Sequence, residues 1–300
     1  MATEPVIRGA HARETPGDAY RRRIATRGVL RSLGKHLLLW PFALLFIFPW
    51  YWMISTSLKL PEIIYQWPPQ WIPNPVTFQA YPEALRDASM ILYTVNTLIV
   101  ALPTIVGSIF SNTLAAYGFS RLHWPGRNFV FIMVLATMML PYHVTMIPVF
   151  LIFNRFNMVN TFWPLIIPFF VGSAWFTFLL RQFFMTMPEE MFDAARIDGC
   201  GELRILWQIV MPLAKPALAV VALFRFIGAW NDFLNPLIYL SDQRMYTITI
   251  GLMGLRQEYG GTNWALLMAG STMAVLPIVV LFFFTQRTFI EGIALTGIKG

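Results

Sequence analysis

Long apolar stretches separated by short polar segments make up most of this chain of 300 residues. A helix needs about 20 apolar residues to cross the core of a bilayer. Six stretches are long enough, at residues 37–58, 91–119, 128–153, 161–184, 216–240 and 266–289. The pattern therefore predicts an all-α membrane protein with six transmembrane helices. Prolines inside several of the stretches either shape these helices or kink them around a cavity that opens and closes.

Composition supports a membrane protein and excludes a soluble one. Hydrophobic residues make up 57% of the chain and charged residues 12%, whereas charged residues are about 25% of an average soluble domain. A soluble enzyme or binding protein of this length could not bury so much apolar surface. A disordered chain is excluded for the same reason.

The net charge of +7 is unevenly distributed along the chain. Residues 1–36 hold eight Lys or Arg and three acids, which predicts a solvated basic tail in the cytoplasm. With this tail inside, the inner segments carry sixteen Lys or Arg and the outer segments five. The positive-inside rule then places both termini in the cytoplasm, including the C-terminal tail at 290–300. Because the basic tail lacks interleaved aromatic residues, nucleic-acid binding is not expected.

The first outer loop, at residues 59–90, is rich in Pro and Trp. Trp side chains favour the membrane–water interface. We expect an irregular connector that lies at this interface, or alternatively a docking segment for a partner outside the cell.

A patterned cytoplasmic segment covers residues 185–215 and predicts two short helices. Thr186 and Glu189 fit a capping box ahead of a helix at 189–198, and Gly199 is placed to end it. A second helix is expected at 202–211, ended by Pro212. Ala194 and Ala195 would leave the first helix flat enough for another protein to approach, although an ordinary amphipathic interfacial helix fits the same pattern.

Signatures of enzyme chemistry are missing from the sequence. It contains no HExxH or GxSxG motif and no cluster of His with carboxylates, so no catalytic or metal site is expected. Gly34-Lys35 is followed by His36, so a Walker A motif is lacking too. ATP hydrolysis would therefore require another subunit.

Two motifs resemble those of ABC importer permeases. The run Asp193-Ala194-Ala195-Arg196-Ile197-Asp198-Gly199, followed by Ile209 and Met211-Pro212, resembles the EAA signature, with Asp193 in place of Glu and Met211 in place of Leu. Trp230-Asn231-Asp232-Phe233 is similar to the WNxF element of carbohydrate permeases. Residues 93–127, 138–168, 178–191 and 287–300 resemble the same branch, which includes the maltose-type second permease.

This resemblance implies the type I importer fold, with an ABC type-1 transmembrane domain of five helices at 91–289 and the EAA coupling loop at 185–215. It implies that the loop inserts into a dimeric cytoplasmic ABC ATPase, which would bind ATP and Mg; no cofactor is expected in this chain. The other implied partners are a second homologous permease subunit, an extracytoplasmic solute-binding protein and the lipid bilayer of a prokaryotic inner or plasma membrane. The residues carried over as coupling residues are Glu190, Asp193, Ala194, Ala195, Asp198 and Gly199.

Polar residues of the fifth span are the candidates for the substrate pathway. Arg225 and Asp232 lie seven residues apart and so share a helix face. Asn231 and Asp232 could hydrogen-bond sugar hydroxyls while Trp230 or Phe233 stacks on a sugar ring. Alternatively, these residues bond to other helices. The resemblance favours an oligosaccharide or disaccharide, and a glycerol-phosphate or a polyol is the alternative substrate. A stand-alone secondary transporter or channel would account for six spans but not for the cytoplasmic loop.

Overall fold

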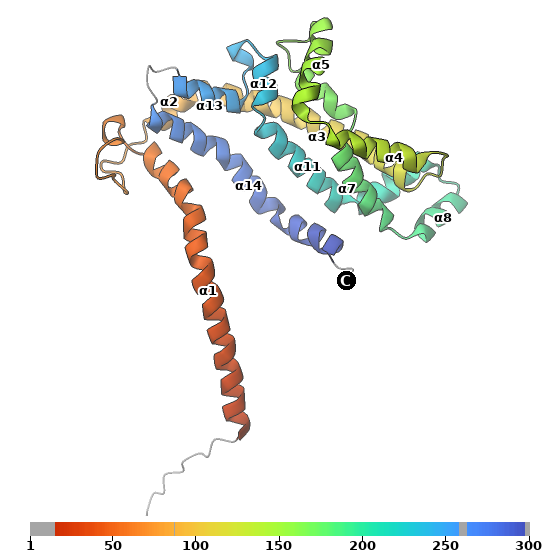
Figure 1. The fold of residues 1–300 in the computed structure, drawn as a ribbon, viewed down its shortest axis with the longest axis horizontal. Helices are drawn as coiled ribbons and strands as arrows, with labels where there is room; N and C mark the ends of the chain where they lie inside the picture. Colours follow the sequence, from red (N-terminus) through yellow and green to blue (C-terminus); the bar gives the residue numbers. More distant parts are fainter. Residues whose placement is uncertain (1–15, 87, 258–262, 298–300) are drawn as a thin grey trace, which may run out of the picture. The chain divides into compact units, whose positions relative to one another are not determined.

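The computed structural model describes residues 16–86, 88–257 and 263–297. These residues form helices joined by turns and irregular segments, and no strand occurs among them (Figure 1). The chain divides into two compact units, residues 1–53 and 54–300.

The first unit consists of most of α1, which runs from Pro16 to Ser57. The predicted first span at 37–58 lies in this helix, whose residues Lys35–Ser57 are apolar and long enough to cross a membrane. Residues 16–36, predicted as a solvated tail, instead continue the same helix toward its N-terminus. This stretch is rich in Arg, which favours helix, and Pro16 suits a first turn. Residues 1–15 lie outside the described part of the chain.

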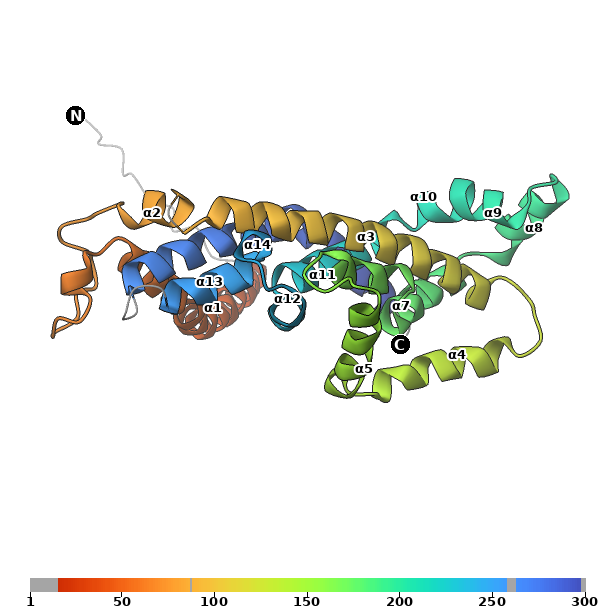
Figure 2. The same ribbon diagram turned by 90° about the horizontal axis from the view of Figure 1, so that it is seen from above.

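The second unit is arranged around α3, Met90–Ser120, which matches the second predicted span. Figure 2 shows α3 passing α14, α11 and α7 in turn. Contacts within the described residues join α3 to α11 (Lys215–Trp230) and to α7 (Ala174–Met185) above all. The predicted sixth span lies in α14, Trp264–Gly297, which also includes most of the predicted C-terminal tail.

The third predicted span is a bent pair and not one straight helix. It consists of α4 (Arg127–Ala136), the 3-10 turn η2 (Thr137–Met139) and α5 (Tyr142–Arg155), with a bend of 99° between the two halves. The bend lies at Leu140, whose ψ of 118° is extended. Proline disfavours helical backbone at the residue before it, and Pro141 follows Leu140.

The fourth and fifth predicted spans are also interrupted. The fourth is built from α6 (Trp163–Ile166), η3 (Ile167–Phe170) and α7, with Gly172 at a φ of +101° between them. The fifth was predicted to be continuous over 216–240, but α11 ends at Trp230 and α12 (Leu234–Tyr239) follows after a break. By length and hydropathy, four described helices could cross a membrane, or up to six if each bent pair is one span.

The remaining short elements outside the segment 185–215 lie in two of the three predicted outer loops. The first loop contains η1 (Pro61–Ile63) and α2 (Ala80–Arg86), with irregular chain between them, as expected. The loop after the fifth span contains η5 (Gln243–Met245) and α13 (Ile248–Gln257), neither of which the sequence pattern predicted.

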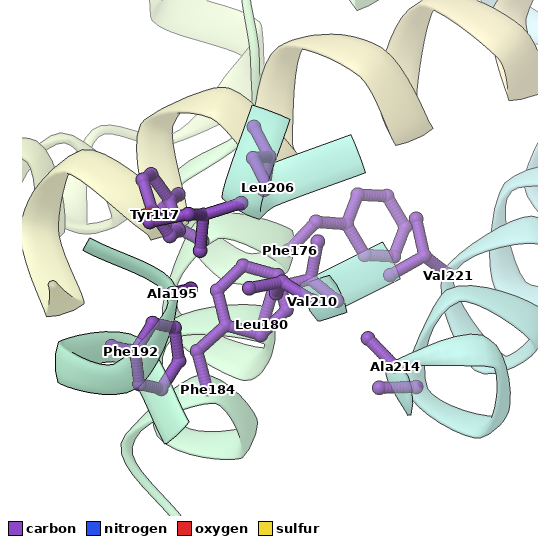
Figure 3. Close-up of a cluster of buried hydrophobic side chains, with 13 residues drawn as sticks. Tyr117, Phe176, Leu180, Phe184, Phe192, Ala195, Leu206, Val210, Ala214 and Val221 are labelled. Carbon is purple, nitrogen blue, oxygen red and sulfur yellow. The ribbon is translucent and has the colours of Figure 1, made fainter. Parts of the chain in front are cut away.

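The largest described cluster of buried side chains lies where α3, α7 and the segment 189–214 meet (Figure 3). Leu180, Phe184, Phe192 and Val210 are fully buried there. Phe192 belongs to α8 (Glu189–Ile197), so the core reaches from the membrane helices into the predicted cytoplasmic loop. Burial of this apolar surface fixes α8 against the rest of the unit.

Candidate functional site

The predicted first loop helix is α8, and it ends as the sequence indicated. Gly199 has a φ of +79°, a conformation that favours glycine. The Cys200 amide donates to the carbonyl of Ala195 at 2.9 Å, and the Gly199 amide donates to the carbonyl of Arg196 at 3.0 Å. These two bonds form a Schellman motif, which confirms Gly199 as the residue that terminates the helix.

The predicted capping box at the start of α8 is wrong. The N-cap is Pro188, and no side-chain hydrogen bond caps the helix. The Thr186 hydroxyl donates to the carbonyl of Phe183 at 2.7 Å, and the Glu189 carboxylate pairs with Arg121. Both side chains of the expected box are therefore engaged elsewhere.

Most of the predicted coupling residues lie on one accessible surface. Glu190, Asp193, Ala194, Asp198 and Gly199 are exposed, whereas Ala195 is 7% exposed and packs into the core. Ala195 therefore cannot form part of a flat outer surface, because it lies on the inner face of α8 with Phe192 (Figure 3). Ile197, at 86% exposure, adds an apolar side chain to the accessible surface.

The second loop helix continues past its predicted end. It consists of α9 (Glu202–Ile205), a π-helical turn (Leu206–Val210) and α10 (Met211–Leu213). Pro212 lies inside this continuous helix and does not stop it. The break comes at Ala214, and the chain bends by 80° into α11.

Arg121, at the end of α3, is a functional candidate that the sequence analysis counted only as an inner-loop charge. Its side chain is 5% exposed and lies at the base of α8. The guanidinium pairs with the Glu189 carboxylate and donates to the carbonyls of Phe184 and Met187. It also lies over the Phe192 ring, 4.1 Å from the centroid. The sequence did contain a signal for this role of Arg121. The residue is basic, directly follows an apolar helix, and could pair with the acidic segment later in the chain.

Further polar contacts join α3, α8 and α9. The Tyr117 hydroxyl donates to the Glu202 carboxylate at 2.5 Å, and the Arg196 Nε donates to the same carboxylate at 2.9 Å. Arg196 also pairs with Asp193 at 3.1 Å. The hydrogen bond to Glu202 raises the pKa of the Arg196 guanidinium. The network keeps the two loop helices in one arrangement on either side of Gly199.

Trp230, a predicted pathway residue, is buried between helices. It is 3% exposed, its indole N–H donates to the carbonyl of Ala274 at 2.9 Å, and its ring stacks on Phe226. These contacts make it a packing residue between α11 and α14. Asn231 is exposed at the end of α11, and its amide donates to the carbonyl of Ile227 at 2.9 Å.

Asp232 lies at the break after α11, within a polar cluster. Its carboxylate accepts hydrogen bonds from the backbone and side-chain amides of Asn235. The Tyr142 hydroxyl of α5 donates to the side-chain Oδ1 of Asn235, and the Thr249 hydroxyl donates to the backbone carbonyl of Asp232. The cluster brings α5, α12 and α13 together, and the sequence analysis did not include Tyr142 or Asn235.

Arg225 lies apart from this cluster. Its guanidinium lies 3.4 Å from the centroid of the Phe169 ring, and its Nε donates to the Thr104 hydroxyl at 3.3 Å. Among the described contacts, Arg225 and Asp232 form no direct ion pair. This agrees with the expectation that they lie too far apart along the helix to bond.

The bent membrane helices and the exposed helical loop held against them define a polytopic transport subunit. Residues 107–293 match the family described as binding-protein-dependent transport system inner membrane component, and the chain belongs to this family. The family predicted from the EAA-like and WNxF-like motifs is thereby confirmed. The chain is a multi-pass membrane protein.

Two relatives and one solved structure illustrate the family. The arabinooligosaccharides transport system permease protein AraQ of Halalkalibacterium halodurans is 38% identical over 205 residues, which are 68% of this chain and 73% of AraQ. The sn-glycerol-3-phosphate transport system permease protein UgpE of Yersinia enterocolitica is 33% identical over 265 residues, covering 86% of this chain and 94% of UgpE. A chain of a bacterial ABC transporter involved in the import of the acidic polysaccharide alginate has the same fold, with a TM-score of 0.76 and 24% identity over 86% of this chain and 96% of its own length.

Proposed function

We propose that this chain is the sugar-uptake permease subunit of an ATP-driven ABC importer. It forms half of the pathway for an oligosaccharide or disaccharide, and a second homologous permease subunit forms the other half. In the proposed topology, α4 with α5 forms one span and α11 with α12 forms another, so that six helices cross the membrane and both termini are cytoplasmic. An extracytoplasmic solute-binding protein delivers the sugar.

The accessible surface of α8 is the observation that carries this proposal. It presents Glu190, Asp193, Ala194, Asp198 and Gly199 on a helix whose inner face is fixed by the buried side chains of Phe192 and Ala195. A helix held in this way transmits a push to the membrane helices, because packed interfaces switch between discrete arrangements. The proposed partner at this surface is a dimeric cytoplasmic ABC ATPase, which binds ATP and Mg and supplies the hydrolysis.

Asn231, Asp232 and Arg225 are the proposed contacts of the substrate pathway. All three lie on α11 or at the break that follows it, where irregular backbone at membrane depth is tolerated only inside protein or along a cavity. Tyr142 and Asn235, which bond within the Asp232 cluster, belong to the same proposed lining. Trp230 supports this segment through its packing against α14.

A glycerol-phosphate or a polyol is the alternative substrate. The similarity to UgpE, named as an sn-glycerol-3-phosphate transport permease, favours it. So does Arg225, whose Nε bonds only the neutral Thr104 hydroxyl and whose positive charge could attract a phosphate.

The test is ATP hydrolysis by the purified, assembled complex in lipid nanodiscs. We expect the binding protein loaded with arabinooligosaccharides or a disaccharide to stimulate hydrolysis more strongly than the same protein loaded with glycerol-3-phosphate. Stronger stimulation by glycerol-3-phosphate would establish the alternative. Solute uptake by the chain alone, driven by a proton or sodium gradient without ATP, would refute an ABC importer subunit.

A further inference from the structure

The guanidinium of Arg121 is nearly enclosed at the point where α3 meets the loop helices. A charged side chain is seldom buried without partners, because its desolvation is costly. All four partners of Arg121 lie at or just before the start of α8. Glu189 and Phe192 belong to α8, and the carbonyls of Phe184 and Met187 lie in the segment that leads into it. Arg121, the residue that caps the end of α3, therefore holds the start of α8 by an ion pair, hydrogen bonds and a ring contact.

Tyr117 adds a second attachment one helical turn earlier. Its hydroxyl bonds the Glu202 carboxylate on α9, and that carboxylate also accepts from Arg196 on α8. The last turn of α3 is thus bonded to both loop helices, on either side of the Gly199 break. Neither helix can turn about Gly199 without breaking a bond to α3.

The first turns of α3 carry comparable attachments to the loop before α13. The Asn96 side-chain amide donates to the backbone carbonyls of Arg244 and Tyr246 at 2.8 and 3.0 Å, and the Thr97 hydroxyl accepts from the Ile248 amide at 2.9 Å. Asn96 and Thr97 are buried. From Asn96 to Arg121 the helix rises roughly 37 Å, more than the thickness of a bilayer core.

We infer that Arg121 is a positioning residue that locks α8 to α3, so that the two helices move as one body and α3 carries the displacement to residues 244–248 on the other side of the membrane. This inference rests on the proposed function, in which α8 meets the ATPase. The inference identifies α3 as the helix that links the contact between α8 and the ATPase to the outer side of the membrane, from which the substrate is delivered. The ion pair with Glu189 sets the position of α8, and the hydrogen bonds to the carbonyls of Phe184 and Met187 limit the freedom of the Arg121 guanidinium.

The test uses the assembled complex and compares ATP hydrolysis with and without the sugar-loaded binding protein. Arg121→Ala should reduce the stimulation about fivefold or more, as expected for loss of a coupling interaction between two sites. Arg121→Lys should recover part of it, because an ammonium can pair with Glu189 but cannot span Glu189 and both carbonyls. The matched control is Arg204→Ala, since Arg204 is an exposed arginine of α9 whose side chain bonds Gln208.

Two further variants keep the test informative if Arg121→Ala fails to assemble. Glu189→Gln changes a half-exposed side chain and should lower stimulation in the same direction. Exchange of the pair, Arg121→Glu with Glu189→Arg, should restore less than wild-type stimulation but more than Arg121→Glu alone. Wild-type stimulation in both Arg121→Ala and Glu189→Gln would overturn the inference.

An independent readout is the distance between spin labels at Val106 on α3 and Ile197 on α8, in a Cys200→Ser background. Both positions are exposed, and transport by the labelled complex is checked first. In the wild type, we expect the same distance between the labels without nucleotide and with trapped ATP. In Arg121→Lys, we expect a broadened distribution of this distance. A nucleotide-dependent change in the wild type would refute movement as one body. Absence of saccharide-stimulated hydrolysis in the wild type would refute the proposed sugar uptake instead.

Discussion

Gly251 of α13 lies directly against the ring of Tyr93 in α3. A Cβ atom built at Gly251 would stand 2.1 Å from the Tyr93 Cδ2, far inside van der Waals contact. Small residues let membrane helices approach closely, and this pair does so without a GxxxG motif. The contact fixes α13 to the first turns of α3.

Gly251→Ala should therefore destabilise the protein, by about 1–3 kcal/mol for an overpacked contact. Gly254→Ala is the matched control, because that position on the same helix faces open space. The midpoint of thermal unfolding of the purified complex measures both. Equal midpoints for the two variants would show that Tyr93 moves aside without cost.

Asn112 in α3 stabilises the break before α7. Its side-chain oxygen accepts hydrogen bonds from the Ser173 amide at 2.7 Å and the Thr177 hydroxyl at 2.9 Å, and Asn112 is fully buried. Asn112→Leu removes the acceptor of the half-buried Ser173 amide and of the buried Thr177 hydroxyl, and a buried unpaired donor costs about 1–3 kcal/mol. We expect poor assembly and a lowered unfolding midpoint, whereas Asn154→Leu on the exposed face of α5 should change neither.

Gly199→Ala should raise the free energy of the folded loop by about 1–2 kcal/mol, because a Cβ atom strains left-handed backbone. The matched control is Gly201→Ala: Gly201 has an ordinary φ of −72° and open space around it. Gly199→Asp should in addition uncouple ATP hydrolysis from uptake, because it adds a charged side chain to the accessible surface of α8. Intact coupling in Gly199→Asp would contradict a docking role for this end of the helix.

Trp230→Phe should weaken packing without altering substrate selectivity. It removes the indole hydrogen bond to the Ala274 carbonyl, worth about 0.5–1.5 kcal/mol, and keeps a ring against Phe226. Uptake of different saccharides by whole cells, corrected for the amount of assembled complex, measures the selectivity. A changed order of preferred saccharides would show that the ring reaches the substrate after all.

The sequence predicted the elements whose signals are local. Helix α3 lies within a residue or two of its expected bounds, and the Gly199 stop of α8 followed from glycine at the right spacing. The break at 231–233 was missed because an apolar average over about 20 residues does not register an interruption inside it. The bend at Leu140 lies next to Pro141, one of the prolines expected to shape or kink the spans. The attachment of α8 to α3 was also missed, because Arg121 and Glu189 are 68 positions apart and only the fold brings them together.

The π-helical turn at Leu206–Val210 sets the angular phase between the loop helices and α11. Such a turn holds one residue more than an α-helical turn, and each residue advances a helix by about 100°. Deleting a single residue there would restore regular winding and leave the helix before it nearly in phase, whereas a deletion in α11, which has no extra residue to absorb it, would rotate everything before it by more than a quarter of a revolution. The acidic side of α8 would then face away from its partner, although every side chain of that surface were still present.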